Sequence, residues 1–143
     1  MICFLYEETD NIVFFIHFVT LCSDKVEDGE CADWRICRGA HSVALYAKIK
    51  KSVDDIISTQ QPDGYIGNYR LDAQLKSWDI WGRKYTTLGL LSWYEISGEK
   101  QALNAACRVI DHLMTQVGEG GTNIVTTGNY YGMASSSILE PVM

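Results

Sequence analysis

Apolar residues recur with a helical period from Leu45 onward. They fall at i, i+4, i+8, i+11 and i+12, which is one face of an amphipathic helix. Asp54 and Asp55 lie on the opposite, charged face, so we interpret them as residues of the solvent-exposed face with no catalytic role. Pro62 and Gly64 predict the end of this helix. The apolar stripe consists of Leu45, Ile49, Val53, Ile56 and Ile57.

Two further helices follow in the pattern. The stretch "WDIWGRKYTTLGLLSWYEIS", residues 78–97, predicts a helix that ends at Ser97 and Gly98. The next helix is predicted from Lys100 to about Gln116, where "GEGG" ends it. The expected buried stripes are Trp81, Tyr85, Leu88 and Leu91 in the first of these helices, and Leu103, Ala106, Ile110 and Leu113 in the second.

The lengths of the connections alternate. The helices at 78–97 and 100–116 are joined by a short turn, whereas residues 62–77 and 118–134 form long loops that each contain the tripeptide GNY. This alternation predicts an all-α fold of antiparallel helical hairpins, as in an α/α toroid, with both long loops at one end. Ser137 and Glu140 have the spacing of a capping box, which predicts a fourth helix starting there.

Composition separates residues 1–44 from the remainder. Residues 1–44 contain eight acidic and three basic side chains, and four of the five cysteines without a CxxC pair, which disfavours a structural zinc site. The net charge of −6 disfavours nucleic acid as a partner. The apolar stretch "NIVFFIHFVTLC" is too short to span a membrane. Acidic residues precede it, so it is not a convincing signal peptide, and localisation stays open.

Residues 45–143 resemble the catalytic domain of β-L-arabinofuranosidase-type glycoside hydrolases. The resemblance is carried by "LYAKIKKSVDDIISTQQPDGYIGNY", "WDIWGRKYTTLGLLSWYEISGEKQALNAACRVIDHL" and "GMASSSILEPVM", in the same order and at the same spacing as in that family. It implies part of an (α/α)6 barrel, a carbohydrate ligand, and retaining hydrolysis of glycosidic bonds in the complete domain.

The sequence departs from the family pattern at several points. Better-known members carry two histidines in an HELYxxGH motif, where this chain reads "GRKYTTLG", residues 82–89. A further histidine expected in the last helix is replaced within "ASSSILEPV". The family's acid/base glutamate and zinc-bound cysteine map beyond the fourth helix. We therefore expect no catalytic residue, no metal ligand and no cofactor in this chain, with zinc belonging to the complete family domain.

The segment 1–44 does not match the family pattern. Its different charge and cysteine content lead to the hypothesis that it is non-native or frame-disrupted. The predicted organisation is therefore a poorly interpretable segment, residues 1–44, followed by residues 45–143 as a fragment of an α/α-barrel hydrolase domain.

Eight residues are candidates for carbohydrate binding. For most of them a structural interpretation stands beside the functional one: a turn at Asp63 and Tyr65, helix packing near Trp78, and core packing at Tyr85. Cations in the first turn of a helix oppose its dipole, so they indicate an anionic or hydroxyl-rich ligand, or a carboxylate partner elsewhere. The candidates are Asp63, Tyr65, Trp78, Arg83, Lys84, Tyr85, Asn129 and Tyr130.

Two other reactive side chains are interpreted as structural. His112, late in its helix, is expected to be solvated or favoured by the helix dipole. Cys107 is expected to be a buried thiol.

Three functions remain open from the sequence. The first is a fragment of an arabinofuranosidase-like hydrolase that is inactive by itself. The second is a non-catalytic helical module that binds glycans or a partner protein. The third is an α/α-barrel polysaccharide lyase, in which Tyr, Arg and Lys would replace paired carboxylates.

Overall fold

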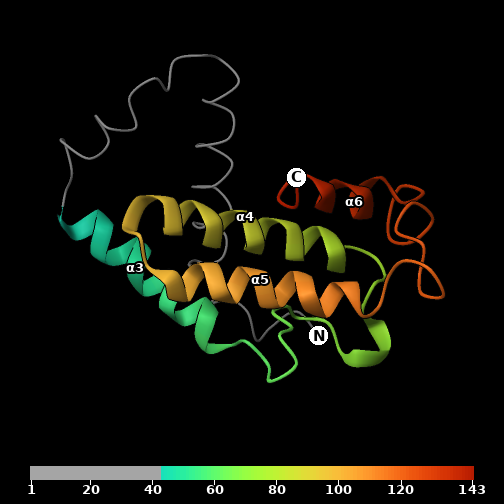
Figure 1. The fold of residues 1–143 in the computed structure, drawn as a ribbon, viewed down its shortest axis with the longest axis horizontal. Helices are drawn as coiled ribbons and strands as arrows, with labels where there is room; N and C mark the ends of the chain where they lie inside the picture. The colour runs from blue at the N-terminus through green and yellow to red at the C-terminus, as the bar shows by residue number, and fades with distance from the viewer. Residues whose placement is uncertain (1–42) are drawn as a thin grey trace, which may run out of the picture. The chain divides into compact units, whose positions relative to one another are not determined.

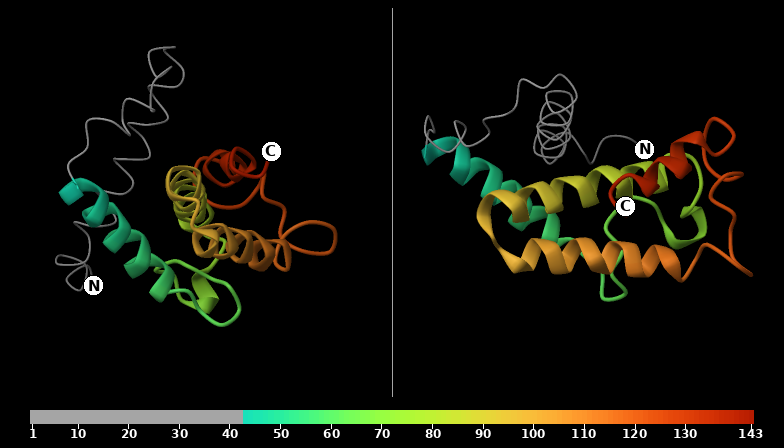
Figure 2. Two further views of the ribbon diagram at one scale, coloured as in Figure 1. Left: turned by 60° about the vertical axis from the view of Figure 1, so that its left-hand side comes forward. Right: turned by 45° about the horizontal axis from the view of Figure 1, so that its top comes forward.

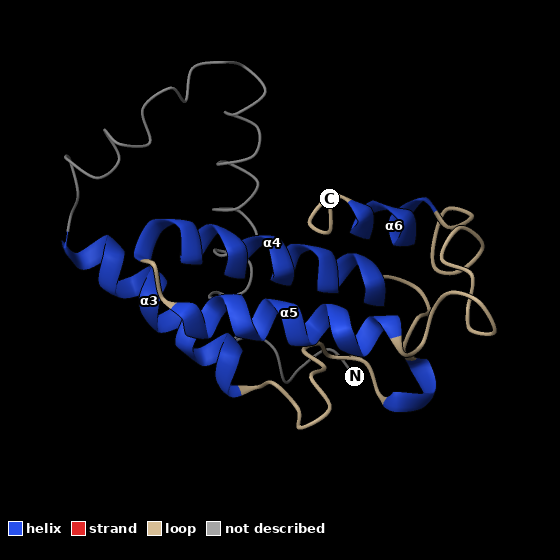
Figure 3. Ribbon diagram, in the orientation of Figure 1, coloured by secondary structure: helices blue, strands red, loops and turns tan. Residues whose placement is uncertain are grey.

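The computed structural model describes residues 43–143, which divide into two compact units between Asp55 and Ile56. Most of the segment predicted to be non-native, residues 1–44, lies outside the described residues. The described chain is helical and contains no strand (Figure 3). This confirms the all-α prediction for the part of the chain that can be described. None of its helices is long and apolar enough to cross a membrane.

Helix α3 (Val43–Ser58) has the predicted amphipathic character. Ile49, Val53 and Ile56 are buried, and two lysines form exposed i,i+4 ion pairs with Asp54 and Asp55. The two aspartates are therefore on the solvated face, as predicted.

The turn after α3 is fastened to α5 (Lys100–Met114). Arg108 donates hydrogen bonds to the carbonyls of Gln61 and Pro62, and Gln60 Nε2 donates to the carbonyl of Ala105. Gly64 has φ of 101°, and a Cβ at this position would come 2.5 Å from a backbone oxygen of α5. The turn that ends α3 therefore needs glycine for both its backbone angle and its closeness to α5.

Helices α4 (Asp79–Ser97) and α5 form the predicted hairpin. They run side by side in both views of Figure 2 and are joined at Gly98, whose left-handed conformation ends α4 (Figures 1 and 2). The short helix α6 (Met133–Ser136) and the 3-10 turn η2 (Ser137–Leu139) pack against α4. Ile80, Leu113 and Ile138 form the apolar centre where these elements meet.

The predicted buried stripe of α4 is wrong in its orientation. Trp81, Tyr85 and Leu88 are only partly buried, whereas the buried face includes Arg83 and Thr87 beside apolar residues. These polar side chains are tolerated inside because most of their polar atoms find hydrogen-bond partners there. The exception is Arg83 Nε, which is buried without a hydrogen-bond partner among the described residues. In α5 the prediction is partly correct, because Ala106 and Leu113 are buried while Leu103 and Ile110 are partly exposed.

The capping box predicted at Ser137 and Glu140 is also wrong. Helix α6 begins four residues earlier, and the hydroxyl of Ser137 donates to the carbonyl of Ala134. The Glu140 side chain forms an ion pair with Lys84 on α4. Glu140 therefore pairs with a lysine on another helix and does not cap a helix next to it in sequence.

Candidate functional site

The two GNY tripeptides meet at Trp78, the residue that precedes α4. The phenol oxygen of Tyr69, from the first tripeptide, accepts a hydrogen bond from the Trp78 backbone N–H at 3.3 Å. The ring of Tyr130, from the second, lies 5.5 Å from the Trp78 ring, edge to face. The long loops therefore come together at one end of the hairpin, as the sequence predicted.

Four aromatic rings form a continuous series at this end, which we call the aromatic cluster: Trp78, Trp81, Tyr85 and Tyr130. Trp81 lies between Trp78, at 5.4 Å, and Tyr85, at 4.5 Å, with tilted rings in both pairs. Edge-to-face geometry of this kind is favoured by the charge distribution of aromatic rings. Trp78 is 39% exposed and Tyr130 67% exposed, so the cluster presents apolar ring surface to solvent.

The loops that carry the cluster have unusual backbone angles. Leu75, Ser77, Tyr130 and Tyr131 all have positive φ, between 51° and 64°, which non-glycine residues rarely adopt. The loops are also joined directly, because the Asn129 N–H donates to the Ser77 carbonyl at 3.0 Å and the Thr127 hydroxyl donates to the Leu75 carbonyl at 2.8 Å. Strained backbone that is held in this way is common at binding sites.

A buried polar network lies beneath the cluster, centred on Asp79. Its carboxylate accepts hydrogen bonds from the phenol of Tyr65 at 2.7 Å, from the Leu75 N–H at 2.8 Å and from Arg83 Nη2 at 2.7 Å. Tyr65 and Asp79 are 0% and 2% exposed. Burial, followed by the hydrogen bond to Asp79, raises the pKa of the Tyr65 phenol well above its usual range.

Arg83 connects this network to α5. Its Nη1 lies 2.9 Å from Gln116 Oε1 and 3.2 Å from His112 Nδ1, and its guanidinium lies over the Tyr65 ring at 4.6 Å. His112 Nε2 lies 3.3 Å from the carboxylate of Asp63. His112 is only 8% exposed, so the first of its two predicted alternatives, solvation, is wrong. It does lie in the last turn of α5, as the alternative of a dipole-favoured position requires. Its partners on other segments explain how a polar ring is buried.

Lys84 has a different carboxylate partner. Its ammonium group pairs with Glu140 at 2.5 Å and lies 5.0 Å from the centre of the Tyr85 ring. For Arg83 and Lys84 alike, the sequence left open a ligand or a carboxylate partner, and the structure supplies the carboxylate in both cases.

The predicted site residues thus fall into two groups. Trp78, Tyr85 and Tyr130 belong to the aromatic cluster, and Asn129 fastens the loop beneath Tyr130. The others are held by protein partners: Tyr65, Arg83 and Lys84 are buried, and Asp63 caps its own turn by accepting from the Tyr65 N–H. Whether any of the eight binds carbohydrate stays a prediction.

Sequence reasoning missed three contributors to this region, namely Tyr69, Asp79 and His112. Asp79 gave a local signal as an acidic residue in the first turn of a helix, and Tyr69 was marked only by its place in the repeated GNY tripeptide. The prediction of a buried thiol at Cys107 is wrong, because this residue is exposed.

The residues present do not fit the zinc ion that the family resemblance implies. Between residues 43 and 143 no group of three or more His, Cys, Asp or Glu side chains could hold a metal ion. Cys107 is the one cysteine of this range, and it is exposed on α5. We therefore derive no chemistry through zinc from these residues.

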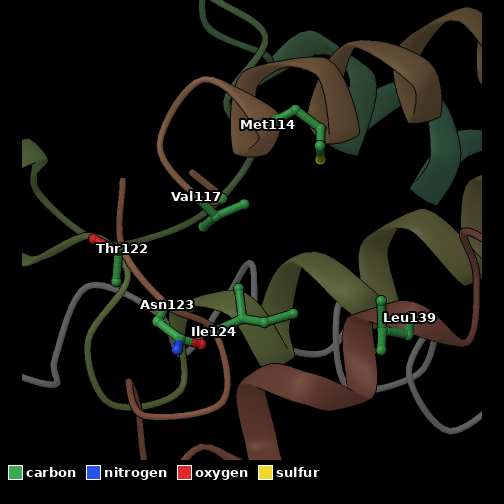
Figure 4. A pocket seen from close by; sticks show the side chains of 7 residues that line it. Met114, Val117, Thr122, Asn123, Ile124 and Leu139 are labelled. Carbon is green, nitrogen blue, oxygen red and sulfur yellow. The ribbon is translucent and has the colours of Figure 1, made fainter. Parts of the chain in front are cut away.

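A separate apolar hollow lies beside the C-terminal end of α5, with a volume of about 420 Å³ (Figure 4). Met114 lines it from the end of α5, Val117 and Ile124 from the loop that follows, and Leu139 from η2. It contains no charged side chain and no residue of the aromatic cluster. Its surface suits an apolar side chain better than a sugar.

The family model described as β-L-arabinofuranosidase, GH127 catalytic domain, matches residues 36–139. The match begins nine residues before Leu45, where the sequence resemblance was recognised. No curated protein and no solved structure matches the chain significantly.

Proposed function

The chain belongs to the family of β-L-arabinofuranosidase GH127 catalytic domains, and on this premise we propose that its aromatic cluster is a carbohydrate-binding surface. The observation that carries the proposal is the exposure of Trp78 and Tyr130 at the point where two strained loops meet. A sugar ring has an apolar face and a hydroxyl-rich edge. An exposed indole beside a phenol offers matching apolar surface and a polar atom.

The ligand we propose is a neutral glycan, such as an arabinose-containing oligosaccharide. A uronate-binding lyase site would need a cation directed at the substrate. The guanidinium of Arg83 is buried and paired with Asp79, and the ammonium of Lys84 is paired with Glu140. Both cations in the first two turns of α4 are thus neutralised within the protein, which favours a neutral ligand over the lyase alternative.

We further propose that this chain binds glycans without hydrolysing them. Glycoside hydrolysis ordinarily uses two carboxyl groups on either side of the bond to be broken. Near the aromatic cluster, Asp79 is buried with its carboxylate engaged in three hydrogen bonds, and Glu140 is bound to Lys84. Neither carboxylate is free to transfer a proton to a bound sugar.

The test is a titration of the full chain followed by tryptophan fluorescence. Arabinose, galactose and uronate oligosaccharides are compared in the wild type, in Trp78→Ala and in Leu71→Ala, which removes an exposed apolar side chain outside the cluster. We expect a fluorescence change with the neutral glycans and a loss of affinity of about tenfold or more in Trp78→Ala only, equivalent to about 1.4 kcal/mol.

Two results would contradict the proposal. Equal binding by the wild type and Trp78→Ala would remove the aromatic cluster as the site. Preference for uronates would support the lyase alternative. An assay with aryl arabinofuranosides and aryl galactosides completes the test, because release of the aryl group by the purified chain would show that it is a hydrolase by itself.

A further inference from the structure

We propose that Tyr65 is a positioning residue for the aromatic cluster, acting on Trp78 through Tyr69 and Asp79. This inference rests on the proposed function, because it concerns the presentation of the same surface. Tyr65 is completely buried and cannot touch a glycan in this arrangement. Its effect must therefore pass through its neighbours.

The hydrogen bonds around Tyr65 form a closed circuit that includes Trp78. The Trp78 N–H donates to the Tyr69 phenol at 3.3 Å, and the Tyr69 N–H donates to the Tyr65 phenol at 3.1 Å. The Tyr65 phenol donates to Asp79 Oδ1 at 2.7 Å, and Asp79 follows Trp78 in the chain. The bonds from the Tyr69 N–H to Tyr65 and from Tyr65 to Asp79 share the Tyr65 hydroxyl, so they polarise one another and the loss of that hydroxyl removes both. The bond from Trp78 depends on them through the position of the Tyr69 residue.

The same circuit holds the strained segment that leads into Trp78. The Leu75 N–H donates to Asp79 Oδ2, and both Leu75 and Ser77 have positive φ. Such conformations persist only where the surrounding contacts fix them. The Asp79 carboxylate fixes Leu75 through Oδ2, and the Tyr65 phenol binds Oδ1 of the same carboxylate. Tyr65 therefore fixes the orientation of the carboxylate that holds Leu75.

The Tyr65 ring also contacts two polar side chains of the network, Arg83 and His112. It lies under the Arg83 guanidinium and 5.6 Å from the His112 ring, so its position is determined by α4 and α5 together. A Cβ on Gly67 would come 2.4 Å from the Tyr65 phenol oxygen, which shows how closely the 60–69 loop wraps around it. The phenol is thereby placed between the loop and the start of α4.

The decisive variants are Tyr65→Phe and Tyr69→Phe. Each removes one phenol oxygen from the circuit and leaves the ring in place. Tyr94→Phe is the matched control, since Tyr94 lies sixteen residues along α4, about 24 Å from Trp78 at the helical rise. We expect both circuit variants to lose at least threefold in affinity for the neutral glycan that the wild type binds, while the control is unchanged.

A spectroscopic measurement separates positioning from overall stability. Trp78 and Trp81 are close enough, at 5.4 Å, for their transitions to couple in near-ultraviolet circular dichroism. Trp78→Phe identifies the coupled signal. We expect Tyr65→Phe and Tyr69→Phe to change that signal at 20 °C while the far-ultraviolet helical signal stays constant.

The outcomes decide between alternatives. If Tyr65→Phe does not fold, Tyr69→Phe tests the circuit in its place. Tyr69 is partly exposed, so loss of the Tyr69 phenol oxygen leaves the Trp78 N–H accessible to water. An unchanged near-ultraviolet signal and unchanged affinity in the folded circuit variants would overturn the positioning role. If the wild type binds no glycan, the proposed function fails, and the near-ultraviolet signal still tests whether Tyr65 positions Trp78.

Discussion

His112 Nδ1 lies 3.2 Å from Nη1 of Arg83, with both side chains buried between α4 and α5. A guanidinium nitrogen can only donate, so Nδ1 must accept and the ring hydrogen must be on Nε2. Nε2 is directed at the Asp63 carboxylate, 3.3 Å away. The imidazole therefore links a loop carboxylate to the buried arginine, and its tautomer is set by its neighbours.

Replacing His112 should show how much its hydrogen bond with Arg83 contributes to the free energy of unfolding. His112→Phe keeps a ring beside Tyr65 but leaves one Arg83 N–H without its acceptor. We expect the free energy of unfolding to fall by about 1–3 kcal/mol, the cost of an unsatisfied buried donor. Urea denaturation measures it. Asp111→Asn, at an exposed neighbouring position, is the control and should change the value by less than about 0.5 kcal/mol.

Arg83 should contribute more than His112. Arg83→Met leaves the Asp79 carboxylate buried without its charge partner, so we expect a loss of about 3–5 kcal/mol. The double variant Arg83→Met/Asp79→Asn removes the unpaired charge and should be more stable than Arg83→Met. Arg70→Met breaks an exposed ion pair and should cost no more than about 1 kcal/mol. A double variant no more stable than the single one would contradict the electrostatic explanation.

Two glycines with left-handed backbone allow a matched comparison, Gly98 at the C-terminus of α4 and Gly132 in the second long loop. Gly98 and Gly132 both have positive φ, at 74° and 85°, but only at Gly132 would a Cβ collide with backbone, 2.2 Å from Val125. Gly98→Ala should cost about 1–2 kcal/mol from backbone strain alone. Gly132→Ala should cost more, and it should displace Tyr130 from Trp78. Unfolding by urea and tryptophan fluorescence measure the two effects, and equal costs would show that the loop yields without strain.

Tyr65 should make stability depend on alkaline pH. Below about pH 10 its phenol is protonated in the folded and unfolded states, so it adds no pH dependence. Its pKa is raised in the folded protein, so above about pH 10 the unfolded state loses the proton first, and the free energy of unfolding falls as pH rises. Tyr65→Phe should show a shallower decline. Absorbance at 295 nm should show one phenol that does not ionise before the protein unfolds.

The sequence predicted where the helices begin and end better than it predicted which of their faces are buried. The bounds of α4 follow from local signals, above all Gly98, which can adopt the left-handed conformation that ends a helix. The buried face of α4 depends instead on partners far along the chain, such as His112, which lies 29 residues after Arg83. Hydrophobic periodicity counts apolar side chains, and it cannot register a polar one that is buried by a distant partner.

The candidate site was predictable to a similar extent. The alternation of short and long connections correctly predicted that two loops meet, because tyrosines from both contact Trp78. The sequence did not distinguish the exposed aromatic residues of the cluster from the buried residues that hold them in place. Tyr65 and Tyr130 both lie in glycine-containing loops, yet Tyr65 is buried and Tyr130 is 67% exposed. The phenol of Tyr65 is held inside by partners on other residues, the Tyr69 N–H and the Asp79 carboxylate.

The hydrogen bonds from Thr127 to Leu75 and from Asn129 to Ser77 have a consequence for protein engineering. The first loop grafted alone onto another scaffold would lack these two donors, and the second loop grafted alone would lack the two acceptors. Residues 60–78 and 118–132 must therefore be transplanted as a pair.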